Sequence, residues 1–529
     1  MSRDQVIIAK SIISPDRDQP LGNAVLIRDG RVVAVGEKLD FACAGRQVTD
    51  LGDAYLFPGF VESHAHLWWM GHLATQIDCG PEANSSVQDI LERVRQATVN
   101  QPPGTWIQGH HWDDTRLAER RPPNLQELTE VAPHHPVYLM HNSSHLAVVN
   151  QMAVNVAGIT RNTDIPGIVH DPHGELTGLL LEATALESVS RHIPLPSQET
   201  MIEEIAKAGV LCHRQGVTAC TDMAMGLGGN ESSVEAVWRA YQVAEQISRL
   251  SVRTTCYARI SGKHTFLPKE GPTPFLTFAG VKLFSDGSIQ GHTASLQEGY
   301  WDQANQRGVL VHSRNDLSAT IQYYHRQGLQ VAVHANGDRA IAETLAAYEQ
   351  ALGNQGDASR RHRIEHAQMA RPEHITSMRS LGILPNFFIG HVYHWGDRHR
   401  DLFLGPQRAA ELNPIRTAHE AGIRFALHSD SPVTPINPLL SIATAVTRRT
   451  STGQILGPGQ AIPVRSAWRA YTSDAAYLGF REEQVGDIRP GLWADFVALS
   501  ANPLEEGPET LDSTQVLRTI VGGRTVWQP

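Results

Sequence analysis

The middle of the chain alternates amphipathic helical patterns with short apolar runs. Residues 199–216 carry apolar side chains at helical spacing, end at Gly216 and precede the apolar run VTACTDM. Later helical patterns end at Gly328, Gly382 and Gly422, and an apolar run again follows each of them. Glycine suits the left-handed position that closes a helix. The repeated unit indicates parallel βα architecture, with a (β/α)8 barrel as the first expectation and a doubly wound sheet as the second.

Both ends of the chain have the alternation of β structure. Asp29-Gly30 and Gly522-Gly523 each separate two apolar, β-branched runs, as in a hairpin. A single hairpin is only marginally stable, so we expect the two ends to pair. We therefore predict a small composite β-sandwich domain from residues 1–56 and 485–529, with the barrel at 57–484.

One region interrupts the βα pattern. From about residue 67 to residue 200 the chain is rich in Trp, Pro and His, with one isolated helical pattern at 86–98. We predict an inserted subdomain here, directly after the first barrel strand.

The amino-acid composition limits which class of protein this chain can belong to. With 529 residues, of which 41% are hydrophobic, the chain can bury a large core. A formal net charge of −10 argues against nucleic acid or an anionic membrane as the main partner. The five cysteines are scattered without a CxxC pair. No apolar run is long enough for a membrane span or a secretory leader, so we expect a cytoplasmic protein.

Histidine is abundant and several copies occupy positions suited to metal binding. His64 and His66 are two residues apart in a predicted strand, so both imidazoles project from one face. Taken alone, this pair is as compatible with a structural role as with a metal. His334, His366 and Asp430 each end a predicted strand, on the face where βα barrels carry their chemistry. Together, the four histidines and the aspartate favour a borderline divalent metal such as zinc.

Lys282 also lies near the end of an apolar strand, VKLF, and only six of the 45 basic residues are lysines. A buried amine can lose its proton, whereas a guanidinium cannot. A neutral Lys282 could react with CO₂ to form a carbamate that bridges two cations. An ion pair with a nearby acid such as Asp286 is the equal alternative.

Five motifs follow one another along the chain: PGFVESHAHL, VKLFSDGS, VHANGDRA, RIEHAQ and HSDSPV. In this order they resemble the amidohydrolase superfamily, in particular its YtcJ-like branch, which is related to N-substituted formamide deformylases. The resemblance implies a (β/α)8 barrel, a composite β-sandwich and one or two divalent metal ions per chain. It also implies a set of metal ligands, with Lys282 as a carbamylated bridge and Asp430 as ligand and catalytic base: His64, His66, Lys282, His334, His366 and Asp430. This sequence departs from the usual residues of the family at 291–294 and 384–386. These departures bear on the identity of the substrate more than on the metal.

Other polar and aromatic residues are candidates for substrate contact. The predicted substrate-binding residues are Trp69, Trp112, His145, His292 and His394. Further candidates for the mouth of the site are Trp68, His110, His111 and Asp113. For the aromatic group His391, Tyr393 and Trp395, a lid and plain helix packing are equal alternatives. For Glu182 we favour a role in anchoring a helix.

These expectations combine into one predicted activity. A metal-activated water would hydrolyse an amide or N-acyl C–N bond, with Asp430 as the proton shuttle. Hydrolysis of an ester, lactone or cyclic imine at the same site is the enzymatic alternative, and a non-catalytic ligand-binding barrel is the other. We expect a small-molecule substrate with an apolar or aromatic portion, no nucleic-acid or membrane partner, and consider a homodimer as the assembly.

Overall fold

Eight parallel strands form the centre of the computed structural model, which describes residues 4–41, 46–226, 233–260 and 266–529. In sheet order they run β6 (Phe60–Ala65), β13 (Val217–Met225), β14 (Arg253–Arg259), β15 (Leu276–Phe284), β16 (Gln330–Ala335), β17 (Arg363–His366), β18 (Leu384–Phe387) and β19 (Ala426–Leu427). Beyond the last strand, the Asp430 amide donates to the His64 carbonyl and the His66 amide donates to the Ser431 carbonyl. These bonds draw the first and last strands together, so the sheet curls into a nearly closed, TIM-like barrel.

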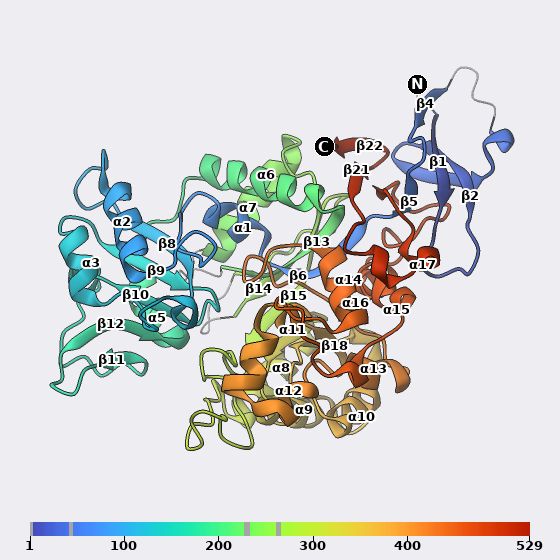
Figure 1. Cartoon of the computed structure of the whole chain (residues 1–529). Helices are drawn as coiled ribbons and strands as arrows, with labels where there is room; N and C mark the ends of the chain where they lie inside the picture. The colour runs from blue at the N-terminus through green and yellow to red at the C-terminus, as the bar shows by residue number, and fades with distance from the viewer. Residues whose placement is uncertain (1–3, 42–45, 227–232, 261–265) are drawn as a thin grey trace.

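Helices alternate with these strands and cover the barrel (Figure 1). They include α6 (Gln198–Arg214), α7 (Ser233–Gln246), α8 (Arg314–Arg326), α9 (Asp338–Leu352), α10 (Pro372–Leu381), α11 (Gly390–Arg398), α12 (Gly405–Ala410), α13 (Ile415–Glu420), α14 (Pro438–Thr447), α15 (Val464–Arg469) and α16 (Ser473–Leu478). A last helix, α17 (Pro503–Glu506), comes after the barrel in the chain. The glycines expected to close the helical patterns, Gly216, Gly328, Gly382 and Gly422, have φ values of 75°, 82°, 69° and 68°. The sequence-based prediction of left-handed glycines is confirmed.

Strands from both ends of the chain join one mixed sheet. Its order is β22 (Arg524–Trp527), β21 (Val516–Val521), β20 (Phe496–Leu499), β5 (Tyr55–Pro58), β1 (Gln5–Ile12), β2 (Gly22–Arg28) and β3 (Arg31–Gly36), and β4 (Gln47–Asp50) pairs with β1. Both predicted hairpins are present, as β2–β3 and β21–β22. The sandwich arrangement and the domain limits stay predictions.

The predicted insertion contains a sheet of its own. Its strands, in sheet order, are β11 (Ile168–His170), β12 (Leu176–Leu181), β10 (Leu146–Val149), β9 (Val137–His141), β8 (Ile107–Trp112) and β7 (Ile77–Asp78). Its helices are α1 (Leu67–Leu73), α2 (Val87–Thr98), α3 (Leu125–Val131), α4 (Gln151–Val156) and α5 (Glu182–Ser190). The isolated helical pattern corresponds to α2, which Ser86 caps.

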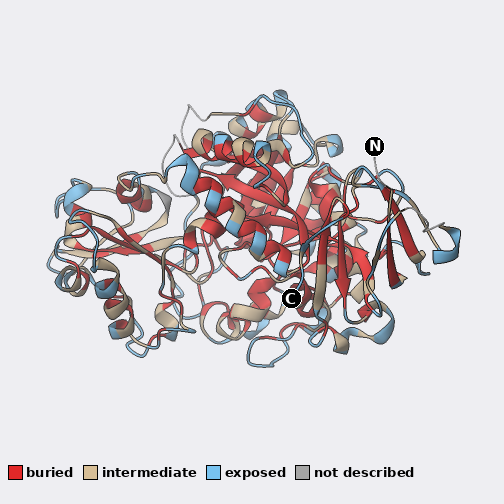
Figure 2. Ribbon diagram, turned by 90° about the horizontal axis from the view of Figure 1, so that it is seen from above, coloured by how far each residue is buried: buried red, intermediate tan, exposed pale blue. Residues whose placement is uncertain are grey.

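The barrel separates the inserted sheet from the terminal sheet, which lie on opposite sides of it (Figures 1 and 2). Figure 2 also shows that buried residues fill the barrel and much of the terminal sheet. No helix in the described ranges has the length and apolar character needed to cross a membrane. Cys79, Cys212, Cys220 and Cys256 are free and buried, and Cys43 lies outside the described residues.

Candidate metal centre and substrate cavity

The barrel brings the predicted metal-binding side chains to one end. All of them are buried and lie in, or directly after, the carboxyl ends of strands β6, β15, β16, β17 and β19: His64, His66, Lys282, His334, His366 and Asp430. Parallel strands place these ends on one rim, where βα barrels carry their active sites.

The Asp430 carboxylate is the centre of this cluster. Its Oδ1 lies 3.0 Å from His64 Nε2 and 3.2 Å from His66 Nε2. Its Oδ2 lies 3.8 Å from His366 Nδ1. Burial would raise the pKa of Asp430, but the imidazoles of His64 and His366 lower it well below its usual value. Asp430 is therefore an ionised acceptor at neutral pH.

His334 occupies the side of the cluster next to His366. Their ring centroids are 4.5 Å apart, in an edge-on arrangement. His334 Nε2 is 3.1 Å from the Gly287 carbonyl and 3.0 Å from Asn336 Nδ2. The structure thus brings His334 to the cluster, with its Nε2 near polar groups of the barrel rim.

Unpartnered nitrogen atoms test whether this cluster suits a metal. His66 Nδ1 and His366 Nδ1 are buried without a hydrogen-bond partner, although buried polar atoms are normally paired. The ligand atoms of His64, His66 and Asp430 lie within 4.8 Å of one another. Imidazole nitrogens and a carboxylate are a donor set that zinc prefers. The residues present fit a divalent metal.

A further histidine at the cluster was not predicted. His428 stacks on the His64 ring at 4.6 Å, and neither of its ring nitrogens has a hydrogen-bond partner. His64, His366 and His428 form a second group whose ligand atoms lie within 4.8 Å of one another. The motif FALHSD contains His428, two residues before Asp430, but no spacing or motif in the sequence marked this histidine as a metal-binding residue.

Glu365 is a second residue that the sequence did not identify. Its Oε2 lies 2.5 Å from His64 Nδ1 and accepts a hydrogen bond from Asn386 Nδ2 at 2.8 Å. Its other oxygen is 2.7 Å from Arg363 Nε. Burial would raise the pKa of Glu365, but Arg363 and His64 lower it far below its usual value. An ionised carboxylate on Nδ1 fixes the tautomer that leaves His64 Nε2 free as a ligand.

Lys282 is buried, with Nζ 3.5 Å from His64 Nε2. Burial lowers the pKa of Lys282 to about 8. Within the described residues, no carboxylate oxygen lies within 4.0 Å of this amine. Asp286 instead accepts hydrogen bonds from the amides of Ser295 and Asn336. The ion pair with Asp286 is not formed, and carbamylation of Lys282 stays a prediction.

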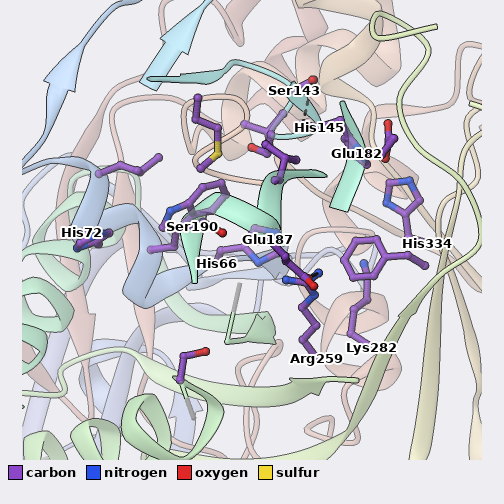
Figure 3. Close-up of a pocket in the computed structure, with 18 of the residues that line it drawn as sticks. His66, His72, Ser143, His145, Glu182, Glu187, Ser190, Arg259, Lys282 and His334 are labelled. Atoms are coloured by element: carbon purple, nitrogen blue, oxygen red, sulfur yellow. Dashed lines mark hydrogen bonds and ion pairs between the residues drawn. The ribbon is translucent and has the colours of Figure 1, made fainter. Parts of the chain in front are cut away.

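A cavity of about 450 Å³ opens over the cluster. Among the predicted contact residues, Trp68, Trp69, His145 and Glu182 line it. His145 Nδ1 is 3.0 Å from Glu182 Oε2. Figure 3 shows this pair, which comes from the insertion, across the cavity from Lys282 of the barrel. The insertion therefore supplies one wall of the site. Several apolar side chains line the same cavity: Met140, Leu186, Ile193, Leu195 and Phe284.

The other predicted substrate contacts lie away from this lining. The Trp112 indole donates to the Leu139 carbonyl at 2.9 Å, inside the core of the insertion. His292 Nε2 lies 2.9 Å from Asp302 Oδ2. His394 is on α11, outside the residues that line the cavity.

The remaining candidates have structural contacts. His391 and Trp395, one turn apart on α11, have ring centroids 4.6 Å apart, and Tyr393 is on the same helix; the lid and plain helix packing stay equal alternatives. Asp113 pairs with Arg398 at 2.6 Å. His110 contacts the Leu73 carbonyl of α1 and His111 the Pro432 carbonyl of the barrel, and both are treated below. Glu182 is the first residue of α5, and its side chain contacts His145; the role in anchoring a helix stays a prediction.

The sequence profile of the amidohydrolase family matches residues 47–527, almost the whole chain. The chain belongs to the amidohydrolase family. The resemblance seen in the five motifs is confirmed.

Individual relatives of this family member cover nearly its full length. Protein LONG AFTER FAR-RED 3 of Arabidopsis thaliana is 30% identical over 99% of this chain and 91% of its own. The putative amidohydrolase YtcJ of Bacillus subtilis is 30% identical over 96% of each chain. N-substituted formamide deformylase of Arthrobacter pascens is 28% identical over 98% of each. An uncharacterized metal-dependent hydrolase from Pyrococcus horikoshii, at 24% identity and a TM-score of 0.75, covers 96% of this chain and 99% of its own and has the same fold.

Proposed function

We propose that this amidohydrolase is a metal-dependent hydrolase of an amide or N-acyl C–N bond in a small molecule. The observation that carries the proposal is the ionised Asp430 carboxylate in contact with His64 and His66, all three in the lining of the cavity. The similarity to an N-substituted formamide deformylase supports the choice of a C–N bond.

The cluster would hold one or two divalent ions, and its donor types favour zinc. The residues that would bind them are His64, His66, Lys282, His334, His366 and Asp430, with His428 beside them. When bound, such an ion lowers the pKa of a water toward ~7 and polarises a carbonyl. Lys282, as a carbamate, would offer the oxygen atoms that join two ions. Burial, which lowers the pKa of this amine to about 8, supports that modification, since only the neutral amine reacts with CO₂.

Asp430 moves the proton in this proposal. Its carboxylate accepts the proton of the attacking water and then delivers it to the leaving nitrogen. The carboxylate is poised between the imidazoles of His64 and His66, which keep it ionised before the reaction begins.

His145 stabilises the negative charge that develops on the carbonyl oxygen of the substrate. Burial opposes the protonated imidazole, but the charge and hydrogen bond of Glu182 raise the pKa of His145 above its ordinary value. Glu182 holds Nδ1, so the remaining ring nitrogen is available to donate to an oxyanion in the cavity. The insertion thereby contributes a charge-stabilising group.

The lining indicates the kind of substrate. Trp69, Leu186 and Phe284 provide apolar surface, whereas Arg259, at the end of β14 beside Lys282, adds a cationic side chain that pairs with Glu187. We propose a substrate with an apolar or aromatic portion. A cytoplasmic location, no nucleic-acid or membrane partner, and assembly as a homodimer belong to the same proposal.

The test is turnover of a panel of N-substituted formamides and N-acyl amines, with matched esters and lactones, by zinc-loaded protein. We expect hydrolysis of the C–N substrates, abolished in Asp430→Asn and retained in Asp302→Asn, whose carboxylate lies outside the cavity. If the protein hydrolyses only the esters or lactones, the bond that it cleaves is C–O and the proposed C–N bond is wrong. No turnover of any compound by metal-loaded protein would favour the ligand-binding barrel.

A further inference from the structure

The inserted sheet carries a second group of metal-type side chains, apart from the rim cluster. Asp78 on β7 and His110 on β8 are register partners in the parallel β7–β8 ladder, and His111 follows directly. One ligand atom from each of the three lies within 4.8 Å of the others.

The backbone of β8 departs from a regular strand at this point. Successive side chains of a strand point to opposite faces, so His110 and His111 should diverge. Instead, the β8–β9 register shifts between Gly109 and Trp112, and His111 has a φ of 69°. The two imidazoles consequently lie 4.3 Å apart with their planes at 90°. Bulges of this kind redirect side chains and cluster at functional sites, and a left-handed histidine costs backbone strain.

Both histidines are oriented as metal-binding histidines are. His110 Nε2 lies 2.9 Å from the Leu73 carbonyl, and His111 Nε2 lies 2.7 Å from the Pro432 carbonyl. A carbonyl can only accept, so each Nε2 carries the hydrogen and each Nδ1 keeps a lone pair. Ligating histidines almost always donate their other N–H to such an outer partner.

The free atom of His110 has no other use. Its side chain is buried, with 7% exposed, and its Nδ1 has no hydrogen-bond partner. Burial lowers the pKa of His110 to about 4, so the imidazole is neutral and its lone pair available at pH 7. Asp78 is exposed and uses Oδ1 to accept the Gly80 amide at 2.8 Å, which leaves its other oxygen free and gives an ion a path from solvent.

We propose that Asp78, His110 and His111 form a second divalent-metal site, with Nδ1 of each histidine and one Asp78 oxygen as ligands. Two imidazoles and a carboxylate are the donor set of a borderline ion such as zinc, with water completing the coordination.

The position of this second site in the fold indicates a structural role for the ion. Leu73 ends α1, the helix that follows His66, and Pro432 comes two residues after Asp430. An ion on His110 and His111 would therefore fasten the inserted sheet to both segments that flank the active-site rim. The site stands independently of the reaction proposed above, since none of its three ligands lines the cavity.

Metal counting tests the site directly. Chelator-stripped protein is reloaded with zinc, freed of excess, and analysed for zinc per chain. The Asp78→Asn/His111→Asn variant should hold one equivalent less than wild type; asparagine tolerates the left-handed backbone of position 111. The control is Asp164→Asn/His134→Asn, which removes an exposed aspartate and an exposed histidine of the same subdomain and should keep the wild-type content.

A zinc-edge anomalous difference map from crystals of the loaded wild type locates the ion. We expect a peak among Asp78, His110 and His111, separate from any peak at His64 and His66. Equal zinc contents in wild type and Asp78→Asn/His111→Asn would overturn the proposal, as would a map with no peak among the three side chains.

Discussion

Glu365 holds His64 in place: its Oε2 lies 2.5 Å from His64 Nδ1, on the side of the ring away from Asp430. Arg363 and Asn386 in turn hold the carboxylate. The cluster at the barrel rim is therefore built in two layers, and the outer layer decides which nitrogen of His64 can serve as a ligand.

Replacing Glu365 by Gln should weaken zinc binding at the rim about 10- to 100-fold, the usual cost of losing an outer-shell partner. Titration against a zinc buffer measures the affinity. Glu349→Gln, an exposed change on α9, is the control and should bind as wild type does. Circular dichroism checks that the Glu365 variant is folded. If the folded variant binds zinc with wild-type affinity, His64 does not depend on Glu365.

Lys282→Ala should lose activity, because the predicted carbamate bridge cannot form. Short-chain carboxylic acids should restore part of it by supplying the missing carboxylate. Lys207→Ala removes an exposed lysine of α6 and should change nothing. An unmodified lysine in a metal-bound structure, together with no rescue by added acids, would contradict the bridging role.

Glu182→Gln should shift the alkaline limb of the pH–kcat profile to lower pH. The protonated form of His145 is the one required, so activity falls as pH rises through its pKa. Glu182 raises that pKa, and burial alone would lower it. Glu187→Gln is the matched control, since Glu187 lines the same cavity but pairs with Arg259. An alkaline limb that does not move in Glu182→Gln would remove His145 from the proposed role.

The barrel could be predicted because its signals are local. Helical spacing and a closing glycine recur before four of the apolar runs, and residues such as His334 and His366 then fall at strand ends by topology alone. The hairpins at Asp29-Gly30 and Gly522-Gly523 were visible for the same reason.

What the sequence did not show depends on contacts between distant residues. Glu365 becomes a partner of His64 only because closure of the barrel brings β6 and β17, 301 positions apart in the chain at this contact, around one interior. Trp112 was expected at the cavity, but its strand directs the indole into the core of the insertion. His292, whose φ is 55°, turns toward Asp302 instead.

The central claim is that Asp430 transfers the proton of the hydrolytic reaction. The direct measurement is kcat of Asp430→Asn on a substrate that wild type hydrolyses, with zinc content determined in the same sample. Asparagine keeps the shape but cannot accept the proton, so kcat should fall by about 10²–10⁴ or more while the histidines retain at least one zinc. A kcat near that of wild type, at full zinc occupancy, would contradict the account.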